Sequence, residues 1–97
     1  MNEKLITEQN LSHVATSFRA ISHPIRIDIL RMFTKNKVMN VTAIQNQLKI
    51  EQAAVSHHLH LLLNTNVVEK KRDGKNSNYY LAEGALQKIE DTLKMWN

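Results

Sequence analysis

The segment VSHHLHLLL, residues 55–63, holds three of the five histidines of the chain within four positions. Imidazole rings bind metals, transfer protons in catalysis, and exchange hydrogen bonds with polar partners such as DNA. The chemistry open to these rings depends on the direction in which each one points. That direction follows from the helix that carries them.

A helix through this segment separates the three histidines. With 100° of rotation per residue, His57 and His60 fall opposite the leucines, and His58 falls at the edge of the apolar side. The apolar side comprises Val55, Leu59, Leu62 and Leu63. We therefore expect His57 and His60 to be exposed. We expect His58 to be partly buried, with its ring hydrogen bonded to nearby backbone.

Two exposed imidazoles three residues apart are open to three interpretations: solvated surface residues, a metal-binding pair, or residues that face a DNA groove. A metal site needs further ligands, but His13 and His23 are distant in sequence and the chain has no cysteine. The same helix face carries Ala53 and Ser56, with Gln52 near the helix start. Small and polar side chains contact base edges and phosphates, so the DNA-facing interpretation is favoured.

The preceding residues indicate two helices that support this segment. A stripe of Leu11, Val14 and Phe18 predicts a helix over about residues 3–20. Pro24 suits the first position of a second helix, because its missing N–H has no partner to lose there.

The second helix is expected to end near residues 34–37, and a third begins soon after it. Thr42 with Gln45 matches a capping box at the start of this third helix. After a break near residues 50–51, the histidine-bearing helix runs to about Asn64. Residues 42–64 thus form a helix-turn-helix pattern.

The character of the chain changes after residue 66. Strand-like runs at about residues 67–72 and 77–82 flank Asp73-Gly74, a strong hairpin signal. Tyr79 and Tyr80 alternate on the second strand, so one should pack on the core and the other stay near the surface. A basic run lies at the hairpin tip: Lys70, Lys71, Arg72 and Lys75. A basic hairpin directly after a helix-turn-helix is a wing that can bind phosphates.

A last helix is predicted over about residues 84–96. Its apolar residues step by three and four positions, which is typical of a helix–helix seam: Leu86, Ile89, Leu93 and Trp96. We predict one domain over residues 1–97, mainly α with a β-hairpin. Its order of elements is α-α-α-α-β-β-α, a winged helix-turn-helix.

Composition agrees with a nucleic-acid partner and limits the alternatives. The 97 residues carry a net charge of +4 and a pI near 9.6, which suits double-stranded DNA. The absence of cysteine and of any apolar run of membrane-spanning length indicates a cytoplasmic protein with no membrane association. With two glycines, no phosphate-cradling loop and no nucleophile constellation, we expect neither an enzyme nor a cofactor.

The segments ISHPIRIDILRMF and VTAIQNQLKIEQAAVSHHLHLLLNTNVVEKKRDGKNSNYYL together resemble the ArsR/SmtB-type winged-helix repressors over about residues 21–81. The resemblance implies a homodimer formed by the first and last helices. It also implies repression by binding a pseudo-palindromic operator, with release by an inducer. The resemblance further implies that Ser56 and His57 enter the major groove while the wing binds the nearby DNA backbone.

The sequence departs from the metal-sensing members of that family. Asn40-Val41-Thr42 stands where those members carry Cys-x-Cys, and the last helix has no histidine. We therefore predict no metal site. Two alternatives stay open: a metal-responsive repressor that uses His57 and His60 or carboxylates such as Glu90 and Asp91, and a winged-helix module that binds another protein.

Two sets of residues carry these predictions. The predicted DNA contacts are Thr42, Gln45, Gln52, Ala53, Ser56, His57, His60, Lys70, Lys71, Arg72 and Lys75. The predicted dimer interface is Leu11, Val14, Phe18, Leu86, Ile89, Leu93 and Trp96.

Overall fold

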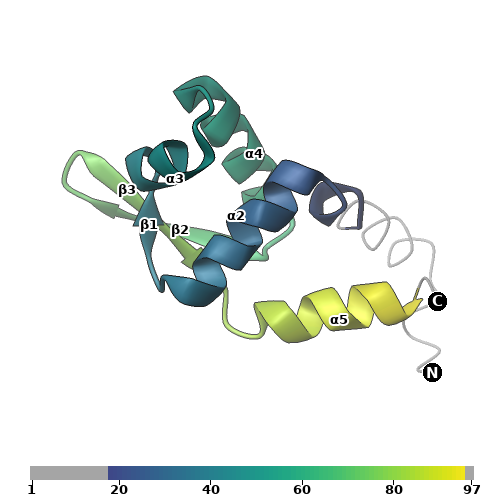
Figure 1. Cartoon of the computed structure of the whole chain (residues 1–97). Coiled ribbons are helices and arrows are strands. Elements are labelled where there is room, and N and C mark those ends of the chain that lie inside the picture. The colour runs from purple at the N-terminus through teal and green to yellow at the C-terminus, as the bar shows by residue number, and fades with distance from the viewer. Residues whose placement is uncertain (1–17, 96–97) are drawn as a thin grey trace.

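A computed structural model describes residues 18–95 of the chain (Figure 1). The first predicted helix lies mostly outside this range, and residues 18–21 are helical. The elements that follow are α2 (Pro24–Lys35), β1 (Met39–Asn40), α3 (Val41–Leu48), α4 (Gln52–Asn64), β2 (Val68–Asp73), β3 (Asn76–Leu81) and α5 (Ala85–Met95). This order confirms the winged helix-turn-helix architecture expected from the sequence.

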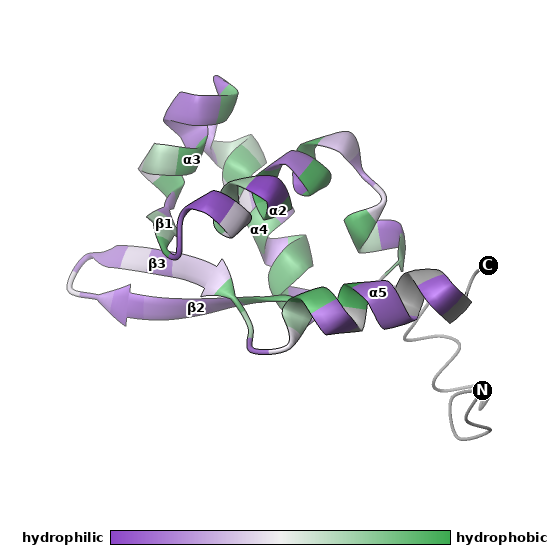
Figure 2. Ribbon diagram, turned by 60° about the horizontal axis from the view of Figure 1, so that its bottom comes forward, coloured by the Kyte–Doolittle hydropathy of each residue, from purple (hydrophilic) through white to green (hydrophobic). Residues whose placement is uncertain are grey.

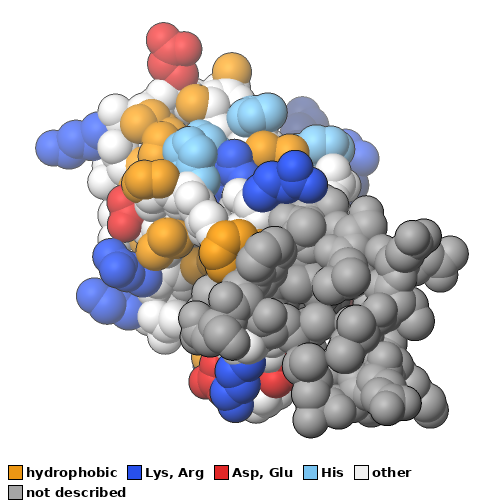
Figure 3. Space-filling view, turned by 90° about the vertical axis from the view of Figure 1, so that its right-hand side faces the viewer, with side chains coloured by type: hydrophobic (Ala, Val, Ile, Leu, Met, Phe, Trp, Pro, Cys, Tyr) orange, Lys and Arg blue, Asp and Glu red, His pale blue; other side chains and the backbone are white. Residues whose placement is uncertain are grey.

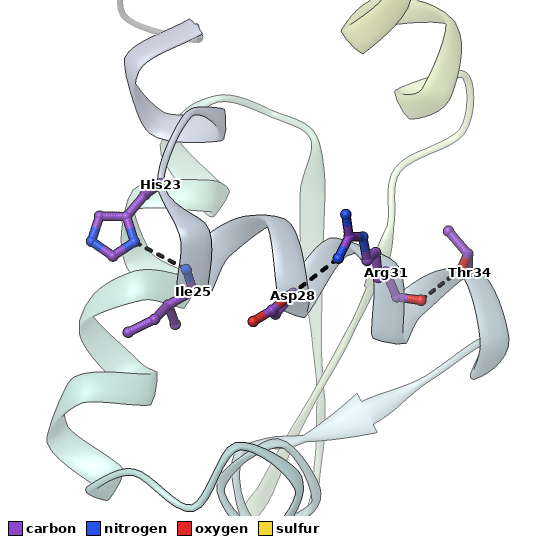
Figure 4. A network of polar contacts seen from close by, with 5 residues as sticks. All are labelled: His23, Ile25, Asp28, Arg31 and Thr34. Atoms are coloured by element: carbon purple, nitrogen blue, oxygen red, sulfur yellow. Dashed lines mark hydrogen bonds and ion pairs between the residues drawn. The ribbon is translucent and has the colours of Figure 1, made fainter.

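Helix α2 begins at Pro24, as predicted. His23 is its N-cap, and the ring Nδ1 accepts a hydrogen bond from the backbone N–H of Ile25 at 3.2 Å (Figure 4). Figure 4 also shows the exposed side of the helix, where Arg31 pairs with Asp28 at 3.6 Å. The other side of the helix is buried through Ile29, Leu30, Met32 and Phe33.

The start of α3 differs from the sequence prediction. Asn40 is the N-cap, and its Oδ1 accepts a hydrogen bond from the backbone N–H of Ala43 at 2.8 Å. Thr42 lies inside the first turn, so the predicted Thr42–Gln45 capping box is wrong. Asparagine is as good an N-cap as serine or threonine, and here it comes two residues earlier. The helix ends at Lys49, which adopts a left-handed conformation with φ of 57°.

The wing belongs to a three-stranded antiparallel sheet with the order β1-β3-β2. The sequence analysis did not predict β1, whose two residues are too few to show a pattern. The hairpin strands lie within one residue of their predicted bounds, and Asp73 pairs with Asn76. The two loop residues are thus Gly74 and Lys75, one position later than Asp73-Gly74. Gly74 has φ of 63° and Lys75 has no positive φ, which is the pattern of a type II′ turn.

The core lies where α2, α3 and α4 meet the base of the sheet. Figure 2 shows the apolar sides of the helices turned towards one another, whereas most of the hairpin is hydrophilic. Val55, Leu59 and Leu62 of α4 are each 0% exposed, and Leu63 is half-buried. The predicted apolar side of α4 is therefore the buried one. Tyr79 is buried and Tyr80 is half-buried, as their alternation on β3 predicted.

We expect Asn40→Ala to lower the free energy of unfolding by about 1 kcal/mol, because it removes the side-chain cap of α3. Thr42→Ala should change it by less than about 0.5 kcal/mol, since an exposed residue away from a cap contributes little. Urea unfolding followed by circular dichroism measures both values. A larger loss for Thr42→Ala than for Asn40→Ala would contradict the cap seen in the structure.

Candidate nucleic-acid interface

The outward side of α4 is small and polar. Ala53, Ser56, His57 and His60 are all exposed, as is Gln52 in the first turn. Their orientation is fixed, because the opposite side of the same helix is packed into the core. The structure thus places every predicted contact on α4 where another molecule can reach it. The N-cap residue Glu51 makes no side-chain hydrogen bond to the first turn.

A polar cleft of about 220 Å³ lies between the helix-turn-helix and the wing. It brings together three predicted contacts from three elements: Thr42 of α3, Gln52 of α4 and Lys75 of the hairpin turn. The remaining lining residues are Asn40, Val41, Asn76, Ser77 and Tyr79. Asn76 and Ser77 are site residues that the sequence analysis missed, because short polar residues beside a turn give no distinct signal. Gln45 does not line this cleft and is half-buried.

The basic residues of the wing do not form one patch. Side chains alternate between the two faces of a strand, and Lys70 pairs with Tyr79 while Arg72 pairs with Ser77. Lys70 and Arg72 therefore lie on the strand face that carries Ser77 and Tyr79, but neither lines the cleft of Lys75, and Arg72 lines a second cleft on the wing. Lys71 points to the other face, opposite Asn78.

The opposite face of the hairpin has a different character. Glu69 pairs with Tyr80 there, and a hydrogen bond with the Glu69 carboxylate raises the pKa of the Tyr80 hydroxyl. A second cleft of about 380 Å³ on the wing is lined by Val38, Lys71, Arg72, Asp73, Asn78 and Tyr80. The predicted phosphate-binding run thus divides between a face that is shared with the helix-turn-helix and a face that also carries acidic groups.

His58 is buried, with 8% of its surface exposed, which confirms the inward position expected from the helical projection. The sequence analysis predicted that its ring would bind nearby backbone, but its hydrogen-bond partner is a side chain of another helix. The Nε–H of Arg26 donates to His58 Nδ1 at 3.2 Å. Burial lowers the pKa of His58 most, and the neighbouring His23, Arg26 and His57 lower it further. Figure 3 shows histidine side chains gathered with Lys or Arg on one face of the molecule.

The predicted dimer residues are described only in part. Leu11, Val14 and Trp96, together with the side chain of Leu93, lie outside the described part of the chain. The other three line one apolar groove of about 390 Å³ between α2 and α5: Phe18, Leu86 and Ile89. Leu86 is 57% exposed and forms an open edge of this groove.

The known proteins that this chain is similar to are helix-turn-helix transcriptional regulators. Residues 21–70 match a family described as a helix-turn-helix domain. An HTH-type transcriptional regulator of Methanocaldococcus jannaschii is 32% identical over 75 residues, which cover 77% of this chain and 84% of that protein. The transcriptional repressor PagR of Bacillus anthracis is 30% identical over 92 residues, covering 95% and 89% of the two chains. The chain belongs to the helix-turn-helix transcriptional regulators.

Solved structures agree with this membership. The crystal structure of PagR superposes with a TM-score of 0.72 at 30% identity, covering 94% of this chain and all of PagR. NolR from Sinorhizobium fredii superposes with a TM-score of 0.75 at 26% identity, covering 98% and 92% of the two chains. This helix-turn-helix protein is a DNA-binding transcriptional regulator, and such regulators are not enzymes.

The described residues also bear on a metal ion and a membrane as alternative partners. Within residues 18–95, no group of three or more His, Asp or Glu side chains is arranged to hold a metal ion. None of the helices in the same range is long and apolar enough to cross a membrane.

We expect Lys75→Ala to reduce the salt dependence of DNA binding, because it removes a cation from the cleft. The slope of log affinity against log salt should become shallower by about 0.9 for each protomer whose Lys75 contacts a phosphate. Fluorescence anisotropy with a mixed-sequence duplex at several salt concentrations measures this slope. Lys35→Ala is the matched control: it removes the same charge from the last turn of α2. Equal slopes for the two variants would contradict a phosphate contact at Lys75.

Proposed function

We propose that this regulator is an ArsR-type repressor that binds a pseudo-palindromic operator as a homodimer. The observation that carries the proposal is the exposed ridge of Ala53, Ser56 and His57 on α4, beside the cleft that contains Lys75. Such a ridge on the second helix of a helix-turn-helix fits the major groove of B-DNA. A basic wing at the same edge reaches the neighbouring backbone.

The residue types on the ridge suit base reading and backbone positioning. The amide of Gln52 can pair with an adenine edge, and the methyl group of Ala53 can contact a thymine methyl. The hydroxyl of Ser56 and the imidazoles of His57 and His60 can hydrogen bond to bases or phosphates. Thr42, at the start of α3, and Lys75, at the wing tip, border the same cleft and would hold adjacent phosphates.

The apolar groove lined by Phe18, Leu86 and Ile89 supports the proposed homodimer, because a second copy of the chain can pack against it. Burying one such side chain gives about 1.5–3 kcal/mol, so a few of them shared across a two-fold axis stabilise a dimer. The dimer would place two α4 helices about 34 Å apart, in successive major grooves on one side of the DNA. The name of PagR, a transcriptional repressor, supports repression as the outcome.

Ser56→Ala and His57→Ala should each weaken operator binding by about tenfold, equivalent to about 1.4 kcal/mol, without changing the unfolding midpoint. The operator is first selected from a pool of random duplexes with the wild-type protein. We expect a two-fold symmetric sequence whose half-sites are about one helical turn apart. Gel-shift titration then compares the variants. Unchanged operator affinity of both variants would contradict the proposal that α4 binds in the major groove of the DNA.

Leu86→Glu should convert the dimer into monomers, because it places a carboxylate in the apolar groove. Sedimentation equilibrium measures the mass, and the same sample should lose operator affinity while it keeps its circular dichroism spectrum. Gln87→Glu is the matched control, since it adds the same charge at an exposed neighbouring position of α5. A Leu86→Glu protein that stays dimeric would exclude this groove as the interface.

A further inference from the structure

Helix α4, the proposed recognition helix, carries a buried titratable residue, His58. His58 is not among the proposed DNA contacts. It follows His57 in sequence, but it points towards α2 and is 8% exposed. A histidine in such a place needs a partner for its ring, and the partner found here constrains its protonation state.

The hydrogen bond to Arg26 fixes the state of the His58 ring. A guanidinium N–H always donates and never accepts, so His58 Nδ1 must be unprotonated to receive the Arg26 Nε–H at 3.2 Å. The ring is therefore neutral, with its proton on Nε2. A doubly protonated ring has an N–H at both nitrogens and no acceptor left for Arg26.

Arg26 holds three segments together through one side chain. While Nε binds His58 of α4, Nη1 donates to the backbone oxygen of Ala20 at 2.9 Å and lies 3.4 Å from that of Arg19. Arg26 itself belongs to α2. The guanidinium thus joins the recognition helix, α2 and the helical residues 18–21 that lead into α2.

The groups around His58 oppose a positive charge on its ring. The His23 ring, at the start of α2, lies with its centroid 4.8 Å from that of His58, and the His57 ring of α4 lies 5.6 Å away. Arg26 supplies a permanent positive charge from α2. Among the described residues, His23, Arg26 and His57 are the charged or titratable groups that act on His58, and all three are bases.

We propose that the Arg26–His58 hydrogen bond is a proton-sensitive link between α2 and α4, the proposed recognition helix, so that protonation of His58 loosens the packing of α4 on α2 and weakens DNA binding. This inference rests on the proposed role of α4 in the groove. The mechanism needs no ligand beyond a proton: the acceptor is lost, and a second cation then faces the guanidinium. His58 and Arg26 act as positioning residues, because neither is on the DNA-facing side of α4.

The direction of the pH effect follows from the pKa of His58. Its pKa lies below the ordinary value of 6.5, chiefly because of burial. The unfolded chain therefore binds this proton at a higher pH than the folded chain does. The contribution of His58 to stability is complete above pH 6.5 and is lost as the pH falls through the lowered pKa.

The first test uses the full-length protein without DNA. Two-dimensional ¹⁵N spectra of the imidazoles should show His58 with an unprotonated Nδ1 at pH 7.5 and a titration midpoint below 6.5. The backbone signals of Arg26 and Ala20 should shift with the same midpoint. A ring that titrates at 6.5 or above, or that titrates without any shift at Arg26 and Ala20, would overturn the link.

The second test compares the wild type with His58→Asn, which keeps an acceptor oxygen at the position of Nδ1 but does not titrate. Operator affinities are measured for both proteins at pH 7.5 and 5.5. The wild-type affinity relative to the variant should fall by about tenfold at the lower pH, within the limit of one linked proton per protomer. Other titrating groups are common to both proteins, so they cancel in this ratio.

His13→Asn is the matched control, because it removes a histidine that is neither a proposed DNA contact nor part of the proposed link. Relative to this variant, the wild type should show no loss of affinity at pH 5.5. A wild-type to His58→Asn ratio that is the same at both pH values would overturn the proposal. If His58→Asn does not fold, the imidazole spectra of the wild type decide the question alone. If no operator binds at either pH, the proposed function fails, whereas the spectra still test the link itself.

Discussion

Helix α4 has to bury one side completely while its other side stays polar, and the arrangement of the site depends on this constraint. Val55, Leu59 and Leu62 lose all contact with solvent, so the helix cannot rotate about its axis without exposing one of them. Their burial also gives the helix its main stabilisation, since no side chain caps its N-terminus. The direction of Ser56 and His57 is therefore a consequence of packing rather than of any contact that these residues make.

In the wing, the burial of one side of strand β3 fixes which residues face the helix-turn-helix. Tyr79 is buried, so the register of β3 decides which cations face the helix-turn-helix. A slip of one residue would move the β2 side chains that lie beside Ser77 and Tyr79 to the other face of the hairpin. The two-residue turn at Gly74 places Lys75 beside Thr42 of α3 and Gln52 of α4 in the cleft.

The sequence was sufficient for the parts of the fold that repeat. The periodic apolar residues of α2 and α4 and the alternation across Tyr79 and Tyr80 predicted elements, faces and burial, because each pattern extends over several turns or residues. The exposed state of His57 and His60 followed from the same periodicity. Membership of the helix-turn-helix transcriptional regulators was also visible in the order and spacing of these segments.

Features that depend on a single contact could not be predicted in this way. Two candidates that are two residues apart, Asn40 and Thr42, both suit an N-cap, and only the backbone path decides between them. Strand β1 exists because β3 lies beside it, which no local pattern records. The partner of His58 lies 32 residues away in the sequence, so a helical projection gives its direction but not the residue that meets it.

Asn40 has two roles, since it pairs with Asn78 of β3 through the sheet and caps α3 through its side chain. The sheet and the helix are thus joined at one residue with no intervening linker. A tilt of the hairpin would therefore also displace the beginning of α3. An insertion beside Asn40 would separate the wing from α3 and change the shape of the cleft between them.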